Sequence, residues 1–270
     1  MARVVIIVPC YNESDRLDCQ RFQTFMCNEH KVVFLFVDDG STDKTAALLA
    51  TLRDSDSSRF GVLSLTDNQG KAEAVRQGFL QAFESNPKYV GFWDADLATP
   101  LSAIPKFLQL LDEHAEVEIV FGSRVKLLGR QIQRRAVRHY LGRLFATVVS
   151  ITLGVGIYDS QCGAKLFRVS PSVKELFRLP FISRWIFDVE IIARLIQARR
   201  GQDTLQVDKI IHEIPLMEWR DIRGSKIKAT DFLIAIFDIL QIYYRYVRSS
   251  PKLSVAARIA DGYIGNGRRK

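Results

Sequence analysis

The stretch YVGFWDADLATP, residues 89–100, contains an apolar run that ends in two aspartates. The run from Tyr89 to Trp93 is typical of a strand buried on both faces of a parallel sheet. Asp94 and Asp96 follow, and two carboxylates so close repel each other unless a cation lies between them. A solvated turn or a helix cap is the alternative use of such a pair. Mg²⁺ and Mn²⁺ prefer hard oxygen ligands, so the pair is a candidate metal site.

Three similar apolar runs precede this stretch, and helical segments separate them. The expected strands are 4–8, 32–37, 61–66 and 89–94, and the expected helices are 16–28, 46–54 and 70–84. Regular alternation of strand and helix predicts an α/β fold, with a doubly wound, mostly parallel sheet flanked by helices.

Each of the four expected strands runs into a polar loop. The loops are PCYNESD (9–15), DDGSTD (38–43), DNQGKA (67–72) and DADLATP (94–100). In open α/β sheets ligands bind outside the carboxyl ends of the strands. The sequence therefore predicts one binding site, lined by these loops, at that edge of the sheet.

Composition excludes several other classes of protein. The chain has 270 residues, 47% of them hydrophobic, with a net charge of +8 and a pI of about 9.4. Its basic residues concentrate after residue 124, without aromatic platforms or a nucleic-acid motif, so nucleic acid is not the expected partner. The four cysteines form no CxxC pair, and no signal peptide is recognised, so we expect reduced thiols in a cytosolic setting.

The second half of the chain contains two apolar segments. Residues 124–143 are rich in Arg and Lys and contain no acid, and the apolar segment 144–158 that follows has only 15 residues. The segment 232–248 is interrupted by polar residues. Neither is a clear transmembrane helix. Residues 140–158 and 232–248 both suit amphipathic helices at a membrane surface, while core packing or a homodimer contact is the alternative. A helix over 184–197 and a strand over 209–219 are also expected.

Eight motifs occur in a fixed order along residues 4 to 245. They are VPCYNE (8–13), VDDGSTDKT (37–45), NQGKAEAVRQGF (68–79), DADL (94–97), GSR (122–124), DSQCGAKLF (159–167), RWIFDVEI (184–191) and EWRDIRGSKI (218–227). Together they resemble the inverting family 2 glycosyltransferases with the GT-A nucleotide-sugar-binding fold. Within that family they are most similar to dolichyl-phosphate glucose and dolichyl-phosphate mannose synthases. Eukaryotic glucose enzymes of this kind carry an N-terminal membrane anchor, whereas this sequence opens at its first expected strand.

The resemblance implies a division of the chain. A GT-A catalytic domain would cover 1–228, with a nucleotide-binding half at about 1–123 and an acceptor-binding half at about 124–228. An amphipathic C-terminal helix would cover 229–250, and a basic, flexible tail 251–270.

The implied reaction is a metal-dependent transfer of glucose from UDP-glucose to a polyprenyl (dolichyl-type) phosphate. Alternatives are GDP-mannose or another UDP-sugar as donor, or a saccharide as acceptor. The implied cofactor is Mg²⁺ or Mn²⁺ on Asp94 and Asp96. The enzyme is expected in the cytoplasm, peripheral at the cytoplasmic face of a membrane.

The family pattern also implies the residues of the donor site. Tyr11 offers a ring on which a base can stack, and Glu13 can accept hydrogen bonds from ribose hydroxyls. Asp39 would bind the base or cap the next helix, and Lys71 would bring a positive charge to the nucleotide. The full expected set is Pro9, Tyr11, Asn12, Glu13, Asp39, Asn68, Lys71, Asp94, Ala95, Asp96 and Gln161, with Asp159 beside Gln161 under the sugar.

A phosphate acceptor is already anionic at pH 7 and needs orientation more than a catalytic base. Arginine recognises phosphate bidentately, which suits residues of the basic segment. The expected acceptor-phosphate residues are Arg124, Arg134, Arg138, Arg220 and Ser225. Lys226 is expected to join Asp94, Asp96 and Arg124 in catalysis, as a cation of a closing loop.

Overall fold

The computed structural model describes residues 2–27, 30–133, 136–199, 207–221 and 229–248. Its strands are β1 Ala2–Cys10, β2 His30–Asp39, β3 Phe60–Leu65, β4 Tyr89–Trp93, β5 Ile119–Ser123, β6 Gln131–Gln133, β7 Ala164–Arg168, β8 Ile211–Pro215 and β9 Glu218–Arg220. Its helices are α1 Cys19–Thr24, α2 Thr45–Ser55, α3 Lys71–Glu84, α4 Ile104–Glu113, α5 Ala136–Leu153, α6 Pro171–Leu176, α7 Phe187–Ala198, α8 Val207–Ile210 and α9 Ala229–Ile242. A 3₁₀ turn, η1 Leu101–Ala103, precedes α4, and a π-helical turn, η2 Tyr243–Val247, continues α9.

The strands form one seven-stranded sheet of order β3-β2-β1-β4-β7-β5-β8 within the described residues. Strands β1 to β4 are parallel to one another, and β5 is parallel to β8. Strand β7 is antiparallel to both of its neighbours, β4 and β5. The expectation of a mostly parallel α/β sheet flanked by helices is confirmed. A separate pair, β6 and β9, lies beside it.

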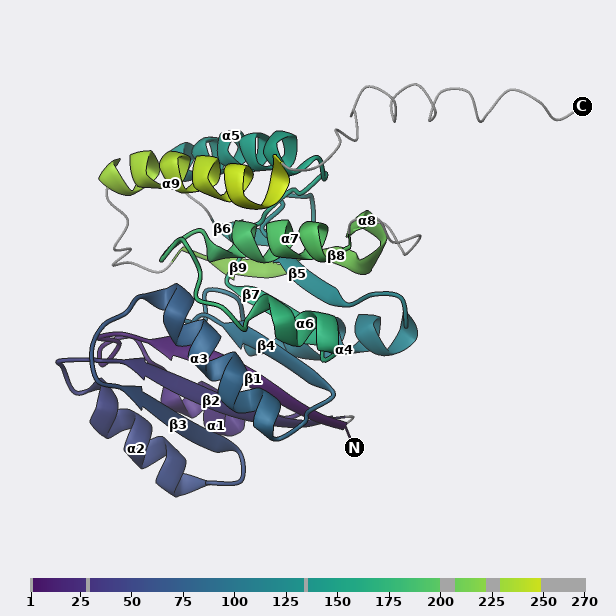
Figure 1. Cartoon of the computed structure of the whole chain (residues 1–270). Coiled ribbons are helices and arrows are strands. Elements are labelled where there is room, and N and C mark those ends of the chain that lie inside the picture. Colours follow the sequence, from purple (N-terminus) through teal and green to yellow (C-terminus); the bar gives the residue numbers. More distant parts are fainter. Residues whose placement is uncertain (1, 28–29, 134–135, 200–206, 222–228, 249–270) are drawn as a thin grey trace, which may run out of the picture.

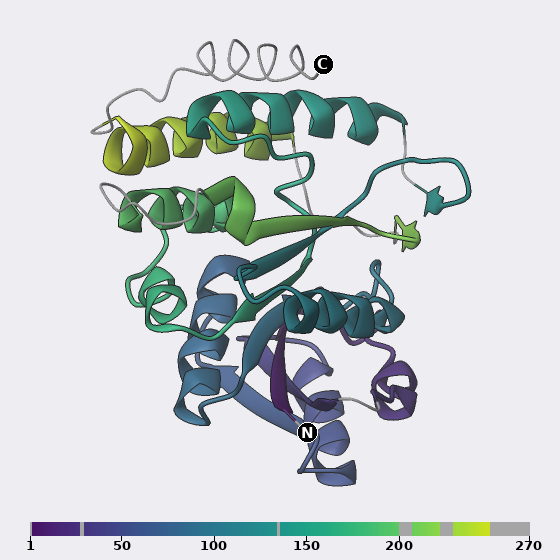
Figure 2. The same cartoon turned by 90° about the vertical axis from the view of Figure 1, so that its right-hand side faces the viewer.

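Apolar side chains fill both faces of the sheet, as the continuous hydrophobic runs predict. On β1, Val5 and Ile7 belong to the core beneath α3 and α7, whereas Val4, Ile6 and Val8 belong to the core beneath α1, α2 and α4. Helices α5 and α9 run side by side at one end of the molecule, in Figures 1 and 2 alike. Among the described residues no helix is long and apolar enough to cross a bilayer.

Two expected elements differ from the observed ones. The expected helix 16–28 is the short α1, because the Asp18 side chain accepts a hydrogen bond from the Arg21 N–H and the chain turns extended at Phe25. The expected strand 209–219 is divided between α8, β8 and β9. Leu216, between the two strands, donates its N–H to the Ser123 carbonyl, and the chain then leaves the large sheet for the small one.

Candidate functional site

The loops that follow β1, β2, β3 and β4 leave the sheet at the same edge, because these strands are parallel. The 159–163 segment reaches this edge from the other direction. It enters β7 at Ala164, whose register partner is Trp93, the last residue of β4. The fold thus brings Asp94 and the DSQCG segment together, although they lie far apart in the sequence.

Asp94 forms an ion pair with Lys71, the first residue of α3. Lys71 Nζ lies 2.5 Å from Asp94 Oδ1, and the two side chains are 26% and 35% exposed. The Asp94 N–H donates to the Gly163 carbonyl at 2.9 Å. A Cβ atom on Gly163 would lie 1.7 Å from Asp94 Oδ2, so the carboxylate occupies space that any side chain at 163 would fill. Burial lowers the Lys71 pKa, but the charges of Asp94, Asp188 and Asp96 outweigh burial and raise it.

Asp96 lies two residues further along the same loop, which Leu97 turns with a φ of 51°. Its Oδ1 accepts the Ala98 N–H at 3.0 Å. Burial and then the Asp94 charge raise the Asp96 pKa, while Lys71 and Arg16 partly compensate. A divalent cation would relieve this repulsion, so the two carboxylates and the Gly163 cradle fit a metal. No group of three or more acidic, His or Cys side chains forms a metal cage in the described part of the chain, so the remaining ligands would come from phosphate oxygens and water.

The loop after β1 is attached to the loop after β2. Asn12, at a φ of 50°, donates its N–H to Ser41 Oγ, and its Oδ1 accepts the Thr42 N–H at 2.8 Å. The Glu13 N–H donates to Thr45 Oγ1, and the Glu13 carboxylate pairs with Arg16. Three other expected donor residues lie nearby in the fold: Pro9 within the end of β1, the partly buried Tyr11 just after it, and the buried Ala95 in the loop after β4.

Asp39 binds the loop that follows β3. Its carboxylate accepts the Gln69 and Gly70 N–H groups at 2.8 Å each and the Asn68 amide at 3.1 Å. Arg184 closes the loop from outside by donating to the Gln69 carbonyl at 2.9 Å. The expected alternative, that Asp39 caps α2, is not observed, because Asp43 accepts the Thr45 N–H there. Burial raises the Asp39 pKa against the effect of these two N–H groups.

Arg124, directly after β5, is clamped by Asp159. Arg124 Nε and Nη2 donate to the Asp159 carboxylate at 2.6 and 2.7 Å, and the Arg124 backbone N–H donates at 3.0 Å. The guanidinium lies over the Trp219 ring at 5.4 Å. Glu213 on β8 holds the segment from behind, since its two carboxylate oxygens accept the Tyr158 and Asp159 N–H groups at 2.7 and 2.8 Å. Burial opposes the charged form of Arg124, but the Asp159 charge outweighs it and raises the Arg124 pKa.

Beside this clamp, buried polar atoms lack a protein partner among the described residues. They are Gln161 Nε2 and the hydroxyls of Ser123 and Ser160. Such atoms normally bond to water or a ligand. Cys162 is buried, and burial raises the pKa of its thiol to about 11, so it is a core residue and not a nucleophile.

Arg220 ends β9 and reaches the same edge through its backbone, because its N–H donates to the Ala98 carbonyl at 3.1 Å. Its exposed side chain pairs with Glu218. Arg134, Ser225 and Lys226 lie outside the described residues, and Arg138 lies on α5, where its side chain is not described.

Reasoning from the sequence missed the residues that position this site. Gly163, Arg184 and Glu213 contact the expected residues directly, as does Arg16 through Glu13. Gly163 and Arg184 stand within recognised motifs, but nothing in the sequence shows which loops they face.

The comparison with protein families decides the class. The family model described as "Glycosyl transferase family 2" matches residues 5–174. The chain belongs to glycosyl transferase family 2. It is therefore a glycosyltransferase, and the GT-A resemblance of its motifs agrees with this family.

Curated members of the family match nearly the whole chain. A dolichyl-phosphate β-glucosyltransferase of Trichomonas vaginalis is 32% identical over 256 residues, covering 90% of this chain and 74% of that protein. The dolichyl-phosphate β-glucosyltransferase of Saccharomyces cerevisiae is 30% identical over 265 residues, with the same coverage. Among solved structures, glucosyl-3-phosphoglycerate synthase of Mycobacterium tuberculosis, in complex with Mn²⁺, UDP and its product, superposes with a TM-score of 0.60. The superposition covers 89% of this chain and 80% of the mycobacterial chain, at 19% sequence identity, and it supports the fold.

Proposed function

We propose that this family 2 enzyme transfers glucose from UDP-glucose to a dolichyl-type polyprenyl phosphate. The observation that carries the proposal is a sheet edge at which the Asp94–Asp96 loop, after β4, faces Lys71, while Arg124 follows β5 on the far side of β7. Similarity to dolichyl-phosphate β-glucosyltransferases over 90% of the chain supports both substrates.

Asp94 and Asp96 would hold Mg²⁺ or Mn²⁺ against the donor diphosphate. The bound cation supplies a Lewis acid that neutralises the departing nucleoside diphosphate. The Mn²⁺ and UDP in the mycobacterial structure support such an ion for a protein of this fold. Lys71 adds a positive charge from the start of α3, where the helix N-terminus also favours an anion.

The loops after β1, β2 and β3 would form the nucleotide pocket. Tyr11 and Glu13 would contact base and ribose, while Asp39 and Asn68, fixed by Arg184, would shape the opposite wall. Pro9, Asn12 and Ala95 would shape the pocket through their backbone, and Gln161 would turn its unpartnered amide to the sugar.

Arg124 would orient the acceptor phosphate, and its clamp by Asp159 and Glu213 fixes the direction of the guanidinium. Arg134, Arg138, Arg220, Ser225 and Lys226 would complete the acceptor site. The acceptor phosphate is already an anion, so the arrangement needs no general base.

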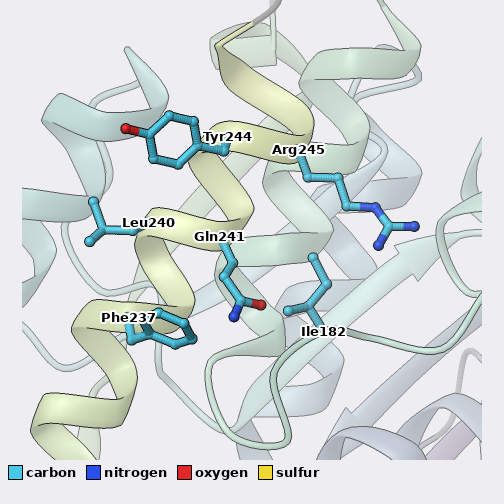
Figure 3. A pocket seen from close by; sticks show the side chains of 6 residues that line it. All are labelled: Ile182, Phe237, Leu240, Gln241, Tyr244 and Arg245. Carbon is cyan, nitrogen blue, oxygen red and sulfur yellow. The ribbon is translucent and has the colours of Figure 1, made fainter.

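A lipid acceptor requires contact with a membrane, and α5 and α9 carry an exposed apolar face. The exposed large apolar residues on these helices and on η2, which continues α9, are Tyr140, Leu141, Leu144, Val148, Ile151, Ile234, Ile236, Phe237, Leu240 and Tyr244. A groove of ≈ 620 Å³ runs along α9, with Phe237, Leu240 and Tyr244 on one side of the helix and Arg245 on another (Figure 3). Mixed apolar and basic faces of this kind suit an interfacial helix, so we propose a peripheral membrane contact here.

Transfer of radiolabel from UDP-glucose into organic-extractable polyprenyl phosphate tests the proposal. Counts should require Mg²⁺ or Mn²⁺ and vanish with chelator. Asp96→Ala should lower the rate at least about 100-fold, because a lost metal ligand removes several kcal/mol of charge stabilisation. Asp54→Ala, in a remote exposed ion pair, is the matched control and should behave as wild type.

If the polyprenyl phosphate were labelled from GDP-mannose and not from UDP-glucose, the assigned donor would change to GDP-mannose. A lipid that stays unlabelled with every donor, while UDP still binds, would overturn the acceptor assignment.

A further inference from the structure

The Lys71 ammonium binds Asp94 Oδ1, a carboxylate oxygen that the proposed metal ion would need as a ligand. Its Nζ lies 2.5 Å from Asp94 Oδ1, which is a direct, charge-assisted hydrogen bond to that oxygen. Both side chains are partly exposed, so an incoming cation can reach the ion pair from solvent.

Of the two partners, Asp94 is held more rigidly. Its backbone N–H is bonded to the Gly163 carbonyl, and its carboxylate fits into the space left by the missing side chain of Gly163. Lys71 carries its charge on a flexible four-carbon stem, which can adopt other rotamers. A cation that approaches Asp94 would therefore displace the ammonium and leave the carboxylate in position.

The neighbouring charges permit Lys71 to leave. Asp188, whose charge also acts on Lys71, already has its own partner, because Lys165 Nζ lies 2.7 Å from Asp188 Oδ1. Lys165 also donates to the Cys162 carbonyl at 2.7 Å and is fully buried, so this second pair stays fixed. Asp94 is the carboxylate that would need a replacement cation.

We propose that Lys71 is an exchangeable counter-ion: it neutralises Asp94 in the free enzyme, yields that oxygen to the divalent cation, and turns to the diphosphate of the donor. This inference rests on the proposed function. The exchange makes metal and nucleotide bind cooperatively. The metal ion releases Lys71 to bind the diphosphate, and the diphosphate draws Lys71 away from Asp94, which leaves the carboxylate to the metal ion. The competing role is a permanent brace, in which Lys71 orients Asp94 for the metal.

The two roles predict opposite effects on Mn²⁺ affinity. The full-length protein would be titrated with Mn²⁺, with and without UDP, and free Mn²⁺ followed by its EPR signal. For Lys71→Met we expect about tenfold tighter Mn²⁺ binding without UDP, because a competing positive charge is gone. The gain in Mn²⁺ affinity that UDP produces should shrink by a similar factor.

Lys71→Arg provides the second variant. A guanidinium keeps the charge but grips a carboxylate with two nitrogens, so exchange predicts Mn²⁺ binding several-fold weaker than wild type. A general charge effect alone would leave this variant unchanged. Lys88→Met is the matched control, because Lys88 forms a similar 2.6 Å pair with Asp112 away from the site.

If the wild-type protein binds Mn²⁺ and UDP, but Lys71→Met binds Mn²⁺ no more tightly than wild type, the exchange is overturned and the proposed function stands. A wild-type protein that binds neither Mn²⁺ nor UDP overturns both.

Discussion

Two ion pairs lie at the same edge of the sheet and differ in almost every physical respect. The Lys71–Asp94 pair rests on one contact of 2.5 Å, with side chains 26% and 35% exposed. The Arg124–Asp159 pair has two side-chain hydrogen bonds of 2.6 and 2.7 Å and is only 13% and 8% exposed. In the first pair an ammonium group binds a partly exposed carboxylate, and in the second a planar guanidinium binds a buried carboxylate.

The difference separates residues that exchange partners from residues that hold the architecture. Asp159 is fixed through its backbone by Glu213, and Arg124 packs over Trp219. Buried pairs of this kind cost several kcal/mol to break, whereas exposed pairs contribute little. The open pair is therefore suited to binding ligands, and the closed pair to presenting Arg124 in one direction.

The largest expected effect comes from breaking the closed pair. Asp159→Ala should lower the free energy of unfolding by about 3–5 kcal/mol, because it leaves the buried Arg124 charge without its partner. Asp94→Ala should cost about 1 kcal/mol or less, since its pair is partly exposed. Urea denaturation of both variants measures the difference. Equal losses of stability would remove the distinction between the two pairs.

A smaller effect is expected at Gly163. Gly163→Ala should cost about 1–3 kcal/mol of stability, because a methyl group would overlap the Asp94 carboxylate. It should also reduce glucose transfer, since the carboxylate must move. Gly156→Ala is the control: a Cβ there meets no heavy atom within 4 Å, and we expect no loss of stability. Thermal unfolding and the transfer assay report the two effects. Full activity of Gly163→Ala would show that the position of the Asp94 carboxylate is not critical.

The smallest effect concerns the reactivity of the Cys162 thiol. It reports on the packing of the 159–163 segment, and we expect it to have no bearing on activity. With the pKa of its thiol raised to about 11, roughly one thousandth of the thiol is ionised at pH 8. The thiolate fraction rises with pH up to that value, so labelling by Ellman's reagent should be slow at pH 8 and faster at pH 10. Cys19 and Cys27 are less buried and should react first. Rapid labelling of Cys162 at pH 8 would mean that the 159–163 segment opens readily.

Strands β1 to β4 could be predicted from the sequence, because each contains an apolar run that ends in a polar loop. Later parts of the sheet depended on tertiary contacts. The 209–219 segment reads as one strand, but its two halves pair with different sheets. The antiparallel direction of β7 also has no local signal, since it is set by pairing with β4 and β5.

For the candidate site, the sequence indicated the loops but not their contacts. Asp94, Lys71 and Arg124 were named as ligand-binding residues, and the structure brings the first two together. That Arg124 is engaged by Asp159, and Asp39 by the 68–70 loop, follows from packing between distant segments. Their roles toward substrates stay predictions.

The position of β7 determines when the molecule can assemble during synthesis. Strands β4 and β5 flank β7 and have no pairing with each other, so their facing edges stay open until residue 168 has been made. Open strand edges invite aggregation, and partly made chains expose them longest. The chain that ends after β5 thus lacks the middle of its own sheet. The parts of the sheet before and after β5 therefore form one folding unit, and we expect neither to fold alone.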